Sequence, residues 1–86
     1  MDLEKLISSS CRRKIIKFLW KTNYVNIMEL VLKINSTYNQ VNANLLILSQ
    51  EGVTEEKRYG RVRMIKLNKE NPKTLFLLQA LKILNT

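Results

Sequence analysis

Apolar residues follow helical spacing over most of this chain and alternate with polar residues over one stretch only. Helical spacing extends over residues 2–52, alternation over residues 53–68, and helical spacing returns from residue 71 to the end. The pattern therefore predicts a mainly α-helical chain with a small β-hairpin. With 86 residues, we expect one domain, residues 1–86, that has little core to spare.

Two short helices joined by a tight turn are predicted over residues 26–52. Asn26 is suited to cap the first helix, and Asn35 tolerates the left-handed conformation that closes it. Thr37 is suited to cap the second helix, and Gly52 fits the left-handed position after its last turn. This arrangement is a helix-turn-helix.

The second of these helices combines a buried stripe with an uncharged polar face. The stripe predicted to face the core consists of Val41, Leu45 and Leu48. The opposite face holds Asn39, Gln40, Asn42 and Ala43. Asn and Gln can pair with the N6 and N7 atoms of adenine in the major groove, and Ala can contact a thymine methyl group. The alternative is an ordinary solvent-facing polar surface.

The alternating stretch after Gly52 predicts a pair of strands that reverses at Tyr59 and Gly60. Ile65 and Leu67 are predicted to lie on the core side of the second strand. The basic residues of the hairpin are Lys57, Arg58, Arg61, Arg63 and Lys66. A cationic hairpin directly after a helix-turn-helix predicts the wing of a winged helix, residues 53–68.

Two helices are expected in the first part of the chain, a short one before the serine run at residues 8–10 and a longer one after it. Arg12 and Arg13 lie near the start of the longer helix. Such a cluster is usually a solvated face, but it could also clamp a phosphate of DNA. Trp20 and Tyr24 are expected to complete the core.

The last helix, residues 71–86, is apolar over more of its circumference than one core requires. Asn71 is the expected cap and Pro72 the first helical residue. One apolar stripe consists of Phe76, Ala80 and Ile83, and the other of Leu77, Leu81 and Leu84. We assign the second stripe to the interface of a homodimer. A membrane-surface helix is the competing interpretation, but this segment has too few basic residues for it.

Composition narrows the classes of function. Fifteen Lys and Arg residues against seven Asp and Glu residues give a net charge of +8, which favours an anionic partner. The sequence lacks an apolar run of membrane-spanning length and a signal-peptide layout, so a cytoplasmic location is expected. Cys11 is the one cysteine and histidine is absent, so neither an enzyme nor a metal or cofactor site is expected.

Several stretches resemble the ArsR-type winged-helix regulators. LISSSCRRKIIKFL is similar to their opening helices, MELVLKINSTYNQVNANLLILSQEGV to their helix-turn-helix, and YGRVRMIKLN to the second strand of their wing. The stretch from Asn71 onward is similar to their dimerising terminal helix. The resemblance implies a homodimeric, sequence-specific transcriptional regulator that binds double-stranded DNA. Metal sensing is not implied, because this chain lacks the Cys and His ligands of the metal-sensing members.

The site residues follow from the resemblance and the patterns together. We assign base reading in the major groove to Thr37, Tyr38, Asn39, Gln40, Asn42 and Ala43. We assign contacts with the DNA backbone, through the first long helix and the wing, to Arg12, Arg13, Lys57, Arg58, Tyr59, Arg61 and Arg63.

A second class of function stays open because residues 34–50 contain no charged side chain, whereas recognition helices commonly carry Arg or Lys. Leu46 and Ile47 also fall on the supposed outer side of this helix. An uncharged helix with exposed apolar residues is suited to docking another protein. The alternative is therefore a winged-helix interaction module without sequence-specific DNA binding.

Overall fold

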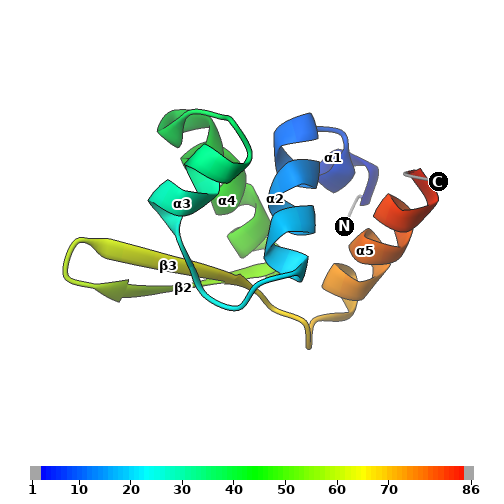
Figure 1. Cartoon of the computed structure of the whole chain (residues 1–86). Helices are drawn as coiled ribbons and strands as arrows, with labels where there is room; N and C mark the ends of the chain where they lie inside the picture. Colours follow the sequence, from blue (N-terminus) through cyan, green and yellow to red (C-terminus); the bar gives the residue numbers. More distant parts are fainter. Residues whose placement is uncertain (1–2, 85–86) are drawn as a thin grey trace.

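A computed structural model describes residues 3–84, with the backbone alone for Leu3 and Leu84. Five helices and three strands follow one another along the chain (Figure 1). They are α1 (Leu3–Ile7), α2 (Ser10–Trp20), β1 (Val25–Asn26), α3 (Ile27–Lys33), α4 (Tyr38–Gln50), β2 (Thr54–Tyr59), β3 (Val62–Leu67) and α5 (Pro72–Leu84). The predicted fold class, mainly α with a β-hairpin wing, is confirmed.

The caps of the helix-turn-helix form as predicted. The Asn26 side chain accepts a hydrogen bond from the backbone N–H of Met28 at 2.9 Å, and Thr37 accepts one from Gln40 at 3.2 Å. The Gln40 side chain makes a separate contact, because its Oε1 accepts a hydrogen bond from the Ser36 hydroxyl at 2.7 Å.

Both helices of the motif end in a left-handed residue, as expected. Asn35 has a φ of 53° and Gly52 a φ of 74°. After Gly52, the backbone N–H of Val53 reaches back to the carbonyl oxygen of Leu48 at 2.9 Å. This bond satisfies a carbonyl that the end of a helix would leave unpaired, and it reverses the chain into β2.

The sheet contains one strand more than the sequence pattern predicts. Its order is β1-β3-β2 and both pairings are antiparallel, so β3 lies in the centre. Ile65 of β3 pairs with Val25 of β1 on one side and with Glu56 of β2 on the other. A strand of two residues has no alternation that a sequence could display, which is why β1 was missed.

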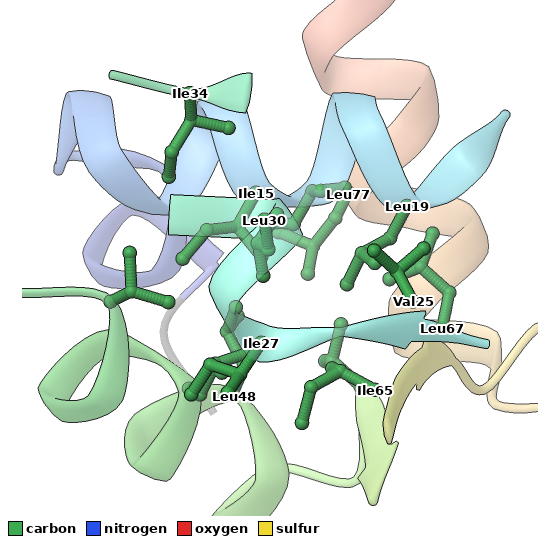
Figure 2. Packing of buried hydrophobic residues seen from close by; sticks show 14 of the residues in the cluster. Ile15, Leu19, Val25, Ile27, Leu30, Ile34, Leu48, Ile65, Leu67 and Leu77 are labelled. Carbon is green, nitrogen blue, oxygen red and sulfur yellow. The ribbon is translucent and has the colours of Figure 1, made fainter. Parts of the chain in front are cut away.

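One apolar core joins the five helices with β1 and β3, and Figure 2 shows part of it from close by. The side chains with almost no exposed surface come from every part of the chain: Ile15, Ile16, Leu19, Leu30, Val41, Leu48, Val53, Ile65 and Leu77. Two aromatic residues differ from expectation. Trp20 is 40% exposed, and the Lys69 ammonium lies over its ring. Tyr24 is half-buried under Lys57 and Lys66.

The helix α5 turns toward the core the stripe that was predicted to face a second copy of the chain. Leu77 is fully buried and Leu81 is 2% exposed, so both belong to the chain's own core. Their assignment to a dimer interface is therefore wrong, and the Leu84 side chain lies outside the described residues. The exposed apolar side is formed by Leu75, Phe76 and Ile83 instead. Periodicity revealed two stripes, but which stripe faces α1 and α2 is decided by packing between distant elements.

The two glycines provide a matched test of the junction after α4. A Cβ atom on Gly52 would lie 2.7 Å from Nδ2 of Asn71, whereas one on Gly60 would meet nothing within 4 Å. Both residues have positive φ, so Gly60→Ala should lower the free energy of unfolding by about 1–2 kcal/mol through conformation alone. Gly52→Ala should cost more, because Asn71 must also move. Urea denaturation of both variants measures the difference, and equal losses would contradict the contact.

Candidate nucleic-acid interface

The helix α4 presents its predicted polar face to solvent. Its buried side consists of Val41, Leu45 and Leu48, as expected. All six residues assigned to base reading are exposed: Thr37, Tyr38, Asn39, Gln40, Asn42 and Ala43. The face is therefore accessible over the first half of the helix, while base reading itself stays a prediction.

A cluster of four polar residues joins this face to the wing, and we call it the wing–helix junction: Tyr38, Asn42, Glu56 and Arg63. Arg63 of β3 forms a two-pronged ion pair with Glu56 of β2, with Nε–Oε2 and Nη2–Oε1 distances of 2.8 Å. Its Nη1 atom donates to the Tyr38 hydroxyl at 2.8 Å and to Oδ1 of Asn42 at 2.7 Å. One guanidinium thus connects both strands of the wing to α4.

Register explains why these four residues meet. Successive side chains of a strand point to opposite faces, so Arg63 shares the face of Ile65 that is directed toward α4 and the core. Glu56 is paired with Ile65 across the two strands, which brings its carboxylate diagonally opposite Arg63. On α4, Tyr38 and Asn42 are four residues apart and therefore lie on the same side of the helix.

Glu56 and Arg63 are both charged at neutral pH, because each favours the charged form of the other. The hydrogen bonds that Arg63 donates lower the pKa of Glu56, while desolvation by burial partly opposes them and Arg58 adds a smaller lowering. The hydrogen bonds to Glu56 raise the pKa of Arg63 above its usual value, again opposed by burial. Only 13% of the Arg63 side chain is exposed, so this pair is better shielded from water than a surface salt bridge.

The wing residues assigned to the DNA backbone therefore fall into two groups. Arg63 is not available as a phosphate contact, because its Nε and Nη1 hydrogens and one on Nη2 are already used inside the chain. The Arg58 side chain is 68% exposed although its Nε contacts Glu56 at 3.0 Å. Arg61 and Tyr59 are exposed at the tip, and Lys57 is exposed with its ammonium 5.0 Å from the Tyr24 ring centre.

The two arginines at the start of α2 have a structural role that sequence reasoning missed. Arg12 donates to the carbonyl oxygens of Lys5 and Leu6 at 2.7 and 3.1 Å, and Arg13 donates to that of Ile7 at 2.6 Å. These are carbonyls that the end of α1 leaves without helical partners. The Nε, Nη1 and Nη2 atoms of Arg12 are all engaged inside the chain, which does not favour its predicted phosphate contact. Arg13 donates through Nη1 alone, so its phosphate contact stays a prediction. An Arg pair shortly after a helix end is the sequence signal for this capping.

A lysine patch borders the amino end of α4. It consists of Lys14, Lys17 and Lys21 of α2 with Lys33 of α3, around a hollow that Phe18, Ile34 and Asn35 also line. All four lysines are exposed, and none has an ion-pair partner within residues 3–84. The sequence does not predict Lys33 as a site residue, because its proximity to α2 depends on tertiary packing.

Two negative findings apply to the described part of the chain. No helix in it combines the length and apolar character needed to cross a bilayer. No group of three or more His, Cys, Asp or Glu side chains in residues 3–84 is placed to hold a metal ion.

The junction predicts a specific dependence of stability on pH. Because the pKa of Glu56 is lowered from 4.5, its ion pair stabilises the folded chain above about pH 4.5 and loses this effect as pH falls through the lower folded-state pKa. Glu56→Gln should cost about 1 kcal/mol near neutral pH, and its difference from the native chain should shrink in acid.

The control for this prediction is Glu55→Gln. Glu55 pairs with Lys66 at 3.7 Å on the outer face of the hairpin, where both side chains are more than one-third exposed. Its substitution should change the unfolding free energy little at any pH. Thermal unfolding between pH 3 and pH 7 measures both variants, and equal pH profiles for the two would contradict the special role of Glu56.

Comparisons with known proteins identify the fold. No protein-family profile and no curated protein matches the chain. A solved structure of a possible transcriptional regulator for arsenical resistance is 21% identical, with a TM-score of 0.72, over 94% of this chain and 80% of that one. The AntR antimony-specific transcriptional repressor is 17% identical, with a TM-score of 0.79, over 96% of this chain and 74% of that one.

A third solved structure is the homodimeric winged helix-turn-helix DNA-binding domain of a possible ArsR-family regulator from Mycobacterium bovis. It is 20% identical, with a TM-score of 0.76, over 94% of this chain and 74% of that one. At these identities the likeness concerns the fold. The chain has the winged helix-turn-helix fold, which it shares with solved structures of ArsR-family and MarR-family transcriptional regulators.

Proposed function

We propose that the chain is a sequence-specific regulator of transcription that binds double-stranded DNA as a homodimer. The helix α4 enters the major groove, and the hairpin of β2 and β3 contacts the backbone or the minor groove. The observation that carries this proposal is the wing–helix junction, which holds the amide face of α4 and the cationic wing in one rigid unit. The transcriptional regulators of the same fold support it.

The distribution of free positive charge supports a phosphate-rich partner. On one side of α4, Arg58 and Arg61 extend from the exposed tip of the wing. Lys33 and the lysines of α2 form the lysine patch beside the turn residues Ile34 and Asn35 that precede α4. A helix inserted into the major groove has a phosphate backbone on either side, so basic residues are needed on both flanks.

The proposed homodimer uses the outward side of α5. Leu75, Phe76 and Ile83 are 48%, 56% and 74% exposed. Association would remove this apolar surface from water, and the buried Leu77 would anchor the helix from the opposite side. Two copies related by a twofold axis would place their α4 helices roughly 34 Å apart on a pseudo-palindromic site.

A protein-docking function is the second candidate, and exposed apolar residues of the motif favour it. Leu46 on α4 is 59% exposed and Leu32 on α3 is 77% exposed. Leu46 lies in the second half of α4, beyond the amides at its amino end, and Leu32 lies in the last turn of α3.

Substitutions in α4 and in the wing should affect DNA binding differently. Asn39→Ala should weaken binding to the specific site by about 1–3 kcal/mol, change binding to random DNA little, and leave the salt dependence unchanged. Arg61→Ala should weaken binding to all sequences and reduce the log–log salt slope by about one. Fluorescence anisotropy at several salt concentrations measures both quantities. If the affinity for the specific site did not change in Asn39→Ala but depended on Leu46, that result would instead support protein docking.

The dimer predicts a difference between two exposed apolar positions. Phe76→Glu should convert the protein to monomers, because a charge on the outward side of α5 would have to be desolvated in the interface. Leu32→Glu is the control, since Leu32 is more exposed than Phe76 but lies on α3. Light scattering at tens of micromolar should show a monomer for the first variant and a dimer for the second. A native protein that is monomeric at this concentration would contradict the interface.

A further inference from the structure

The wing–helix junction determines which way round the Asn42 amide is presented. Arginine carries only hydrogen-bond donors, so the atom of Asn42 that meets Arg63 must be the oxygen. The distance between Nη1 of Arg63 and Oδ1 of Asn42 is 2.7 Å. The amide nitrogen of Asn42 is therefore the free end, and within residues 3–84 its Nδ2 hydrogens have no partner. Asn42 is exposed, so this free end is a donor that faces solvent.

The same guanidinium orients the Tyr38 hydroxyl. Nη1 of Arg63 donates to the hydroxyl oxygen at 2.8 Å, so the hydroxyl hydrogen must point away from Arg63. The Tyr38 ring is 5.9 Å from the guanidinium carbon, and the residue is 40% exposed. Tyr38 therefore presents a second outward donor on the same side of α4 as Asn42, one helical turn away.

We propose that Arg63 makes Asn42 and Tyr38 obligatory donors, and that α4 therefore reads guanine at the base pair these two residues contact. This assignment rests on the proposed function and specifies its base preference. Guanine is the base whose major-groove edge carries two acceptors, N7 and O6, and no donor. Arg63 acts as a positioning residue, because it orients the reading groups from behind without itself reaching the base.

Adenine, which the Asn side chain alone would suggest, is disfavoured by the same contact. Pairing with adenine requires the amide oxygen to accept from the N6 amino group while the amide nitrogen donates to N7. In this chain that oxygen already accepts from Arg63, and a further amino donor there would lie beside a permanent positive charge. Cytosine is disfavoured too, because its major-groove edge offers a donor.

The first experiment selects binding sites from a random duplex library with the native full chain, and repeats the selection with Asn42→Ala. The base position at which the preference disappears in the variant identifies the contact of Asn42. Guanine should be preferred there by roughly 10- to 100-fold over adenine. Selection of adenine or cytosine at that position would overturn the assignment but leave the proposed function intact. Selection of no common sequence would overturn both.

The second experiment tests the role of Arg63 with two opposite changes. Asn42→Asp replaces the outward amide nitrogen by an acceptor at an exposed position, so the preference should invert from guanine to cytosine. Arg63→Met removes every donor and frees the Asn42 amide to turn over. The preference for guanine over adenine should then fall by at least about tenfold. Anisotropy titrations on duplexes that differ at this one base pair measure both effects.

Arg61→Met is the matched control, because Arg61 lies on the same hairpin but is exposed at its tip. It should weaken binding to guanine and adenine duplexes equally. If Arg63→Met does not fold, circular dichroism will show it, and Asn42→Asp then decides the question alone. An unchanged guanine preference in Asn42→Asp would overturn the assignment.

Discussion

Burial of one side of α2 is the constraint on which the rest of the structure depends. Ile15, Ile16 and Leu19 have no exposed surface, and α2 is in contact with α1, α3, α4, α5 and β3 (Figure 1). A chain of this size has room for a single core, so α1, α3, α4, α5 and β3 all pack against that one helix. The helix-turn-helix, the hairpin and the last helix are thus three attachments to a common centre, and none has apolar support of its own.

The wing is attached in a different way from the helices. Its base is apolar, through Val53, Ile65 and Leu67, and beyond this base Arg63 holds it against α4 by polar contacts with Tyr38 and Asn42. Hydrogen bonds prescribe direction and distance more narrowly than apolar contact does, and a two-pronged Arg–carboxylate pair is the most directional of them. Directional hydrogen bonds therefore orient the part of the fold that faces the proposed ligand. The part behind it is stabilised by the burial of apolar surface.

The features that sequence reasoning predicted correctly are local, and those it missed are not. The caps at Asn26, Thr37 and Gly52 depend on neighbours within a few residues, so the sequence contained the whole signal. The role of Arg63 depends on a hydroxyl and an amide that only the folded chain brings near it. The capping by Arg12 is the exception, because its carbonyl partners lie only six and seven residues away in the sequence. A basic residue in a sequence shows its charge, but whether that charge is free or already used is a tertiary property.

Contacts between the end of α4 and the start of α5 join the chain on either side of the hairpin. Asn71 caps α5 through its oxygen, while its nitrogen donates to the carbonyls of Glu51 and Gly52 at the end of α4. Lys73 adds an ion pair with Glu51 at 3.1 Å. The carboxyl end of α4 is thus joined directly to the amino end of α5, and residues 53–70 form a loop out of this joint. The outer part of the hairpin can therefore lengthen or shorten in evolution without altering the angle between the two helices.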